Sequence, residues 1–285
     1  MKSAETLLAC CVVGLACFIG GQAVGVRDRA GHDRALRGEA AGAIDVPGVR
    51  RVGDRVGDRV TDRTESDAPF VPATAAHGEA RLVTSPRAAG ADRPALAPEA
   101  MRRRIAQGLA GTYMPSLLRT RDSALTRWAD RTTRPLRVFL RDGDGIPGWT
   151  PDQLPAVRDA FDTWTRAGIP VRFTFVTDSA SADVHVRFTA GFANGISGKT
   201  VWSRDADFWI VAGAIQLAVA HPGGGAVTPP QMRAIALHEV GHLLGLDHAD
   251  SPDDIMAARV RARDLSDADR ATVRLLYTVP AGSLK

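Results

Sequence analysis

Cysteine is scarce in this chain of 285 residues and is confined to its beginning. All three cysteines, Cys10, Cys11 and Cys17, lie within the first apolar segment. The sequence after residue 17 therefore offers no intrachain disulfide, no thiolate nucleophile and no thiolate metal ligand. A domain that folds in that region must depend on its hydrophobic core or on a bound metal ion.

Lysine is also rare, so the formal net charge of +4 comes mainly from arginine. No stripe of basic side chains with interleaved aromatic residues accompanies this small excess. Such a stripe is typical of nucleic-acid-binding domains. We therefore expect no nucleic-acid partner.

The longest apolar run lies within residues 1–26. It follows Lys2, and Gly21-Gln22-Ala23 has the small-x-small form of a signal peptidase site. Three interpretations remain open: a cleaved signal peptide, a lipoprotein segment with its cysteine at 10 or 17, or a membrane anchor. An anchor would be formed by residues 6–26, because about 20 apolar residues span a bilayer. All three predict a secreted or cell-envelope location outside the cytoplasm for the rest of the chain.

Residues 27–100 have few aromatic side chains and include the repeat RVGDRVGDRVTDR at 51–63. This composition predicts a disordered linker or a pro-segment, because the repeat cannot bury one face. Residues 101–133 are expected to be an entry or pro-segment. Helix-like sequence covers 99–128 and includes MRRRIAQGLAGTYMPSLL and SALTRW.

From residue 134 the sequence changes to alternating strand and helix patterns, which predict one α+β domain over 134–280. Strands are expected at 135–141, 171–176, 182–188, 198–204 and 208–219. Helices are expected at 150–167, from Thr228 to about Gly245, and at 266–277. The second helix is predicted by Thr228, Pro229 and Gln231, which match the capping-box pattern with proline at the first turn.

Glutamate is absent after Glu99 with one exception, Glu239, which lies in HEVGHLLGLDH at 238–248. His238 and His242 are four residues apart, so both imidazoles lie on one face of the predicted helix and can bind one metal ion. Glu239 lies about 100° around the helix from His238, beside the metal rather than on it. A glutamate reaches further than an aspartate toward a metal-bound water, which explains the exception.

Gly245 lets the chain turn at the helix end, where positive φ costs glycine little. This turn would return His248 as a third ligand. Three neutral imidazoles leave the fourth tetrahedral position of zinc open to water, which is typical of a catalytic rather than a structural site. The pattern thus predicts one zinc ion on His238, His242 and His248, with Glu239 as general base and acid.

HEVGHLLGLDH followed by Met256 in DDIMAA resembles the metzincin pattern H-E-x-x-H-x-x-G-x-x-H with its methionine turn. Within metzincins the chain is most similar to matrixin-type peptidases. The resemblance implies a zincin-like α+β domain with a twisted, mostly parallel sheet, an active-site helix and a C-terminal helix. It also implies that Met256 forms an apolar floor under the zinc, and that GKTVWSR at 198–204 is an edge strand pairing with an extended peptide substrate.

The chain departs from that family pattern in several ways. The pro-region has no cysteine to bind the zinc, and His185 and His221 stand apart rather than in a structural zinc cluster. Calcium has no support, because an EF-hand loop at Asp142 would need an acidic residue or asparagine where Ile146 stands. No tyrosine closely follows Met256, so a tyrosine ligand is not expected.

Other residues near the motif have simpler interpretations. The acidic residues of the following loop are expected to be solvated, although one of them could accept an imidazole N–H; these are Asp247, Asp253 and Asp254. Three arginines after the methionine predict a solvated charge run or a wall favouring acidic side chains; these are Arg259, Arg261 and Arg263. Trp202, Phe208 and Trp209 are expected to pack against the sheet.

The sequence therefore predicts an exported zinc endopeptidase that acts on peptide or protein substrates. Two alternatives remain: a zinc-loaded envelope protein that binds peptides or partners with little turnover, and a zinc hydrolase of non-peptide bonds. The presence of Glu239 disfavours the binding protein, because a pure binder needs no base beside its ligands.

Overall fold

A computed structural model describes residues 79–82 and 94–285. Its helices are α1 (Pro98–Gln107), α2 (Met114–Thr120), α3 (Gln153–Thr165), η1 (Ser179–Ser181), α4 (Pro229–Leu243) and α5 (Asp267–Tyr277). Its strands are β1 (Glu79–Leu82), β2 (Ala124–Leu125), β3 (Arg131–Leu140), β4 (Val171–Val176), β5 (Val184–Thr189), β6 (Gly198–Arg204), β7 (Ile210–Ala218) and β8 (Gly282–Ser283).

The expected export signal or anchor at 1–26 lies outside these described residues, as does most of the expected linker. Within the described ranges, no helix has the length and apolar character needed to cross a membrane.

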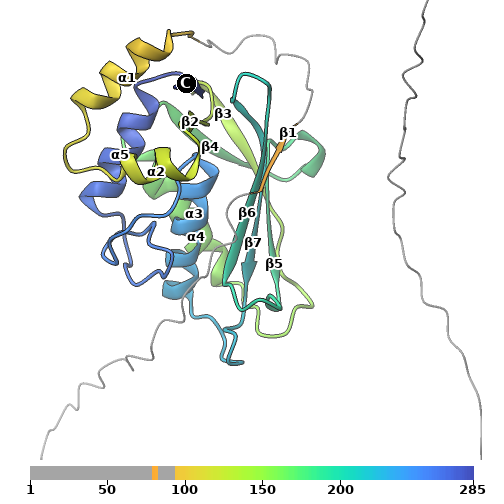
Figure 1. Ribbon diagram of the computed structural model, residues 1–285. Helices are drawn as coiled ribbons and strands as arrows, with labels where there is room; N and C mark the ends of the chain where they lie inside the picture. The colour runs from red at the N-terminus through yellow and green to blue at the C-terminus, as the bar shows by residue number, and fades with distance from the viewer. Residues whose placement is uncertain (1–78, 83–93) are drawn as a thin grey trace, which may run out of the picture. The chain divides into compact units, whose positions relative to one another are not determined.

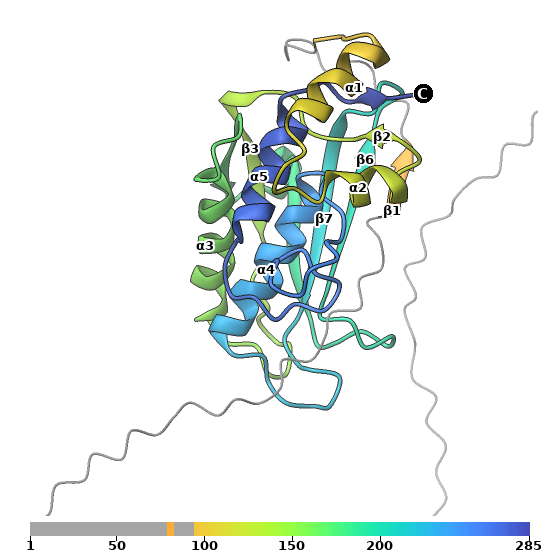
Figure 2. The same cartoon turned by 60° about the vertical axis from the view of Figure 1, so that its left-hand side comes forward.

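The main sheet has six strands in the order β1-β6-β7-β5-β3-β4. All neighbouring strands in it are parallel except β6 and β7, which are antiparallel. Helices α3, α4 and α5 lie on one face of this sheet, and α3 and α4 pack side by side (Figure 1; Figure 2). The predicted α+β class with a mostly parallel sheet, a helix bearing HEVGH and a C-terminal helix is confirmed.

The strands follow the alternation seen in the sequence. In β5, Val184, Val186 and Phe188 are buried while His185 and Arg187 are exposed. One face of this strand therefore packs into the core and the other meets solvent. The expected bounds of β4 and β6 are confirmed. β3 begins at Arg131, four residues before the expected strand, and β7 covers Ile210–Ala218 within the expected 208–219.

The expected helical character of residues 99–128 holds only as far as α2. Asp122 and Ser123 adopt positive φ of 50° and 60° and turn the chain out of the helix. Ala124 and Leu125 then form β2, which pairs antiparallel with β8 near the C-terminal end. Tertiary pairing with a segment more than 150 positions away overrides the local helical propensity.

The expectation that β6 is an edge strand is wrong for this structure. Strand β1 pairs with it in parallel, and Glu79 to Leu82 lie opposite Val201 to Arg204. β1 also falls within the 27–100 segment expected to be a linker. The physical reason is that an exposed edge offers unpaired N–H and C=O groups to any extended segment, and EARL is too short to show a strand period.

Two tryptophans hold α4 against the rest of the core. Trp164 of α3 donates its indole N–H to Leu237 O, and Trp128, which precedes β3, donates to Leu243 O, each at 2.8 Å. Both tryptophans are fully buried. Since Trp128 precedes the expected domain start at 134, the sequence before that position contributes to the core that positions α4.

Trp128→Phe should lower the free energy of unfolding by about 2 to 3 kcal/mol, because Leu243 O loses its donor in a dry environment. Chemical denaturation of the purified protein measures this. Trp149→Phe is the matched control: its indole nitrogen is buried without a hydrogen-bond partner among the described residues. Trp149→Phe should lower the free energy of unfolding by about 1 kcal/mol or less. Equal losses in the two variants would show that the hydrogen bond to α4 is unimportant.

Candidate metal centre

Helix α4 begins and ends as the sequence predicts. At its start the Thr228 N–H donates to Gln231 Oε1 at 2.9 Å. At its end the Leu246 N–H donates to Gly241 O and the Gly245 N–H to His242 O, both at 3.0 Å. Gly245 has a φ of +99°. This pair of bonds around a left-handed glycine is a Schellman turn, which reverses the chain and returns the next residues toward the helix.

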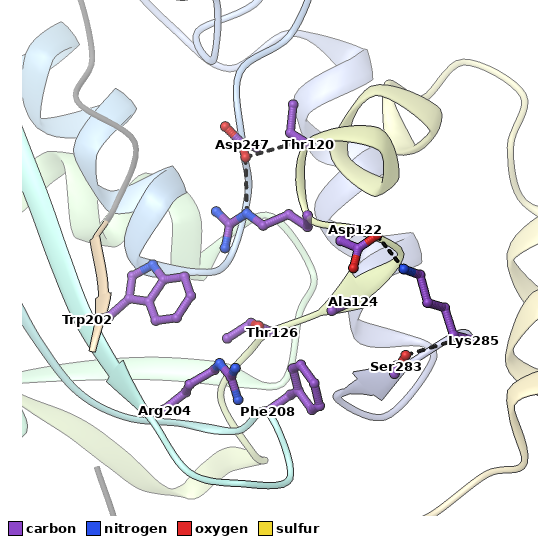
Figure 3. A pocket seen from close by; sticks show the side chains of 11 residues that line it. Thr120, Asp122, Ala124, Thr126, Trp202, Arg204, Phe208, Asp247, Ser283 and Lys285 are labelled. Atoms are coloured by element: carbon purple, nitrogen blue, oxygen red, sulfur yellow. Dashed lines mark hydrogen bonds and ion pairs between the residues drawn. The ribbon is translucent and has the colours of Figure 1, made fainter. Parts of the chain in front are cut away.

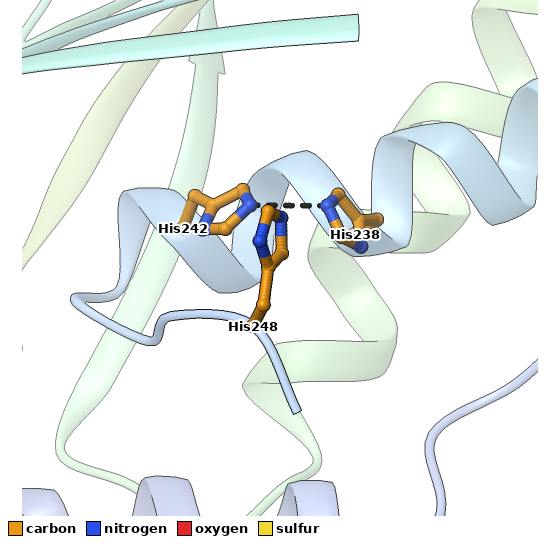
Figure 4. Close-up of side chains that lie close together, drawn as sticks. All are labelled: His238, His242 and His248. Atoms are coloured by element: carbon orange, nitrogen blue, oxygen red, sulfur yellow. Dashed lines mark hydrogen bonds between the residues drawn. The ribbon is translucent and has the colours of Figure 1, made fainter. Parts of the chain in front are cut away.

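That reversal brings the three histidines of the motif together. His238 and His242 project from α4, and His248 projects from the loop after it (Figure 4). One ligand atom from each lies within 4.8 Å of the others. His238 Nε2 and His242 Nε2 are 3.0 Å apart. Two nitrogens bound to one tetrahedral zinc would be about 3.4 Å apart, so the imidazoles suit a single ion.

Backbone carbonyls orient two of the imidazoles. His238 Nδ1 lies 2.8 Å from Ile255 O, and His242 Nδ1 lies 3.1 Å from Leu246 O. A carbonyl can only accept, so Nδ1 carries the proton in each ring and Nε2 keeps the lone pair that a metal needs. Burial lowers the pKa of His238 to about 4 and lowers that of His242 as well. Both rings are therefore neutral, as metal ligands must be.

Glu239 is buried at the interface between α4 and β6. Thr200 donates its hydroxyl to Glu239 Oε2 at 2.6 Å. Gly198 lies so close that a Cβ there would overlap the Glu239 carboxylate. Burial raises the pKa of Glu239 to about 7, although the Thr200 hydrogen bond lowers it. The carboxyl group is thus enclosed between α4 and β6 with a proton affinity suited to transfer near neutral pH.

The methionine turn lies directly beneath α4. Met256 is fully buried, and a Cβ on Gly241 would overlap its sulfur atom. The carboxylate of Asp269 in α5 accepts from Ile255 N at 2.8 Å and from the Tyr113 hydroxyl at 3.1 Å. Ile255 is also the residue whose carbonyl orients His238. Asp269 therefore fixes the methionine turn, and the Ile255 carbonyl of that turn orients the candidate ligand His238.

The loop bearing His248 is fixed by its neighbour Asp247. Asp247 accepts from Arg121 Nε at 3.0 Å and from Thr120 Oγ1 at 2.9 Å, both at the end of α2. Its other oxygen accepts the His248 N–H at 2.8 Å. Burial alone would raise the pKa of Asp247, but the Arg121 guanidinium and these hydrogen bonds hold it well below its usual range. Asp247 thus remains a carboxylate that connects α2 to His248.

The loop acids differ from the expectation that all are solvated. Asp247 and Asp254 are buried, whereas Asp253 is exposed. Asp254 accepts the Ser266 hydroxyl at 2.7 Å. Nor does a carboxylate accept an N–H from His238 or His242, since backbone carbonyls do so. Turn geometry, which a linear pattern does not show, directs these side chains inward.

The remaining candidates lie apart from the three histidines. His185 is exposed and lies 3.0 Å from Ser179 O, while His221 donates to Gln231 Oε1 at 3.2 Å. The arginines of the expected charge run are exposed; they are Arg259, Arg261 and Arg263. Trp202 and Trp209 are buried, and Phe208 is half-buried. Asp142 is exposed in the loop after β3.

Sequence reasoning missed Thr200, Gly198 and Asp269. The alternation of β6 places Thr200 and Gly198 on the same face, but it does not reveal that α4 packs against that face. Asp269 lies three residues after Ser266, a spacing that predicts a capping box. The pattern accounts for its bond to Ser266 N but not for its bonds to the methionine turn.

Gly245→Ala should destabilise the protein by about 3 to 4 kcal/mol, because the residue needs positive φ and a Cβ would overlap Thr126 O. Gly111→Ala is the matched control. Its φ is +70° with open space around the added carbon, so about 1 to 2 kcal/mol is expected. Thermal and urea unfolding compare the two variants. Equal losses would mean that the contact with Thr126 does not constrain the turn.

Comparison with known proteins agrees with this geometry. Residues 150–278 match the model of the matrixin family. The chain is also 30% identical over 146 residues to metalloendoproteinase 1-MMP of Arabidopsis thaliana, an alignment that covers 44% of this chain and 38% of the plant protein. The alignment thus spans less than half of that relative. The domain at residues 150–278 is therefore similar to the matrixin family, and this match spans less than half of the chain.

Proposed function

We propose that this chain is an extracytoplasmic zinc-dependent endopeptidase. The observation that carries the proposal is the convergence of His238, His242 and His248 within 4.8 Å, next to a helix face on which Glu239 is buried. Pure structural zinc sites use a fourth protein ligand, whereas three imidazoles leave one coordination position open. No calcium ion is proposed.

The donor set supports a single zinc ion. The two Nδ1–H groups that donate to carbonyls leave Nε2 of His238 and His242 for the metal, and His248 supplies the third imidazole. When bound, zinc supplies Lewis acidity, which activates water and polarises a carbonyl group. Gly245 would act by placing His248, and Met256 by packing under the helix turn between the first two histidines.

Glu239 would carry the proton through the reaction. As the oxygen of water attacks the peptide carbonyl carbon, the Glu239 carboxylate takes one proton from that water. It then delivers the proton to the amide nitrogen, and the C–N bond breaks to release a carboxylate and an amine. The Thr200 hydroxyl orients the carboxylate through its bond to Oε2, and the close backbone at Gly198 keeps the side chain next to the histidines.

An extended peptide would lie along β6, which borders Glu239. Backbone hydrogen bonds with β6 would keep the peptide extended beside the candidate metal centre. In the described structure β1 takes part of that edge, from Val201 to Arg204. Peptide and β1 would therefore compete for the same N–H and C=O groups.

The export interpretations, including a tether through residues 6–26, remain part of this proposal. The alternatives also remain distinguishable by experiment. A zinc-loaded binding protein would hold zinc and peptide without turnover, and a hydrolase of other bonds would cleave esters or further substrates but not peptides. The presence of Glu239 beside the ligand His238 favours a reaction over binding alone, because a pure binder needs no base there.

The decisive variant is Glu239→Gln, which keeps the shape of the side chain but removes the base. We expect the full-length protein to hold one zinc per chain and to cleave a quenched peptide library in a chelator-sensitive manner. Glu239→Gln should reduce kcat by about a thousandfold or more while zinc content stays the same. Metal analysis and initial rates provide both measurements.

His185→Gln serves as the control, since His185 is exposed and apart from the three histidines. It should keep full activity and full zinc content. Persistent cleavage in Glu239→Gln would contradict the mechanism. Zinc binding without cleavage of any peptide would favour the binding protein, and absence of zinc would overturn the proposal.

Competition between β1 and substrate gives a separate prediction. Ala80→Pro removes a backbone donor within β1 and should weaken its pairing with β6, raising kcat/KM by about five- to tenfold. Ala95→Pro is the control, because Ala95 lies in an exposed stretch outside any helix or strand. Identical kinetics for Ala80→Pro and the unmodified protein would show that β1 does not limit substrate access.

A further inference from the structure

Strand β6 links the candidate metal centre to a separate cavity. Thr200 and Trp202 alternate along this strand, so their side chains share the face that carries the Glu239 contact. The register with β7 shifts between Ser203 and Arg204. Arg204 lies four positions after Thr200, which is about 13 Å along the strand at about 3.3 Å per residue. Trp202 and Arg204 both line the cavity.

The cavity has a volume of about 420 Å³ and lies between the end of α2, β2, β6 and β8 (Figure 3). Trp202 and Phe208 supply aromatic walls. Three cations and two carboxylates also line it: Arg121, Arg204, Lys285, Asp122 and Asp247. The lining is therefore positive overall, and it extends to Asp247, the residue that fixes His248.

The two arginines of the cavity differ in what they contact. Arg121 forms an ion pair: its Nε donates to Asp247 Oδ2 at 3.0 Å, and its Nη2 donates to Leu246 O at 3.3 Å. Arg204 donates through Nη1 to Asp205 O at 3.1 Å, and no described acidic side chain forms an ion pair with it. Arg204 as a residue is half-buried, and its charge has no carboxylate partner among the described residues.

Stacking leaves the donor edge of Arg204 accessible. Its guanidinium carbon lies 4.2 Å from the centre of the Phe208 ring. A stacked guanidinium uses its faces, so its N–H groups in the plane can still bind a carboxylate by two parallel hydrogen bonds.

The turn that supplies Phe208 is strained and is closed by hydrogen bonds. Phe208 has a φ of +68°, a conformation that costs a bulky residue free energy. Asp205 enforces the turn because its Oδ1 accepts from Asp207 N at 3.0 Å and from Trp209 N at 2.9 Å. Strain held in this way keeps the aromatic ring under Arg204 before any ligand arrives.

We propose that this cavity is a substrate subsite that binds an acidic side chain of the extended peptide, with Arg204 as the residue that selects it. The inference rests on the proposed peptidase function and names its substrate class. A peptide antiparallel to β6 runs from Arg204 toward Gly198. The acidic residue therefore lies N-terminal to the cleaved bond, about three to five positions away, given the 13 Å separation.

The test compares pairs of quenched peptides that differ only by Asp against Asn, scanned over positions two to six on each side of the cleaved bond. The full-length, zinc-loaded chain and its Ala80→Pro variant are assayed. We expect the Asp peptide to be favoured in kcat/KM by about tenfold at one N-terminal position. Arg204→Gln should reduce that ratio to about one. Arg172→Gln, which removes an exposed charge from β4 at the opposite edge of the sheet, should leave the ratio unchanged.

A binding measurement separates this inference from the proposed function. The same peptides are titrated by calorimetry against Glu239→Gln with and without Arg204→Gln, where no turnover is expected. Preferential binding of the Asp peptide that disappears with Arg204→Gln supports the subsite even if no variant cleaves peptides. The subsite would be overturned if cleavage or binding showed no preference for Asp. It would also be overturned if the preference survived Arg204→Gln. Either result would leave the peptidase proposal intact.

Discussion

The candidate centre depends on one constraint: the buried imidazoles of α4 must each find an acceptor for Nδ1–H while presenting Nε2 to the same point. Ile255 O and Leu246 O supply these acceptors, and both belong to the chain after the helix. Leu246 is positioned by the Schellman turn and Ile255 by Asp269. The helix, its terminal turn and the methionine turn therefore form one hydrogen-bonded unit, and a shift in any of them would misalign the ligands.

Hydrogen bonds from segments far apart in the sequence also fix α4 and the loop that follows it. Trp164 and Trp128 donate to carbonyls of the helix, and Arg121 with Thr120 holds Asp247 beside His248. Residues 114–128 thus support the centre from the N-terminal side. The matrixin match begins at residue 150, so this support comes from outside the matched region.

Strand β6 gives the site its direction. Gly198 and Thr200 contact Glu239, and the next side chains on the same face lead to the cavity around Arg204. A substrate lying along this strand would meet the reacting groups at one end and a positive, aromatic cavity at the other. β1 pairs with the outer edge of β6 at the cavity end. The same strand would therefore control both the binding of a peptide near the metal centre and the choice of its side chain.

Much of this arrangement was determined by the sequence itself. The 3.6-residue period and the cap residues set the bounds of α4, and the spacing of HEVGHLLGLDH dictated which side chains meet, because helix geometry and a glycine turn are local. The bounds of β4 also followed from two-residue alternation, which is local, whereas β3 begins four residues before the expected strand. Only the tertiary structure decided the partners: Thr200 for Glu239, Asp269 for the methionine turn, β8 for β2 and β1 for β6. These contacts join residues distant in sequence, and no local period records which buried face meets which.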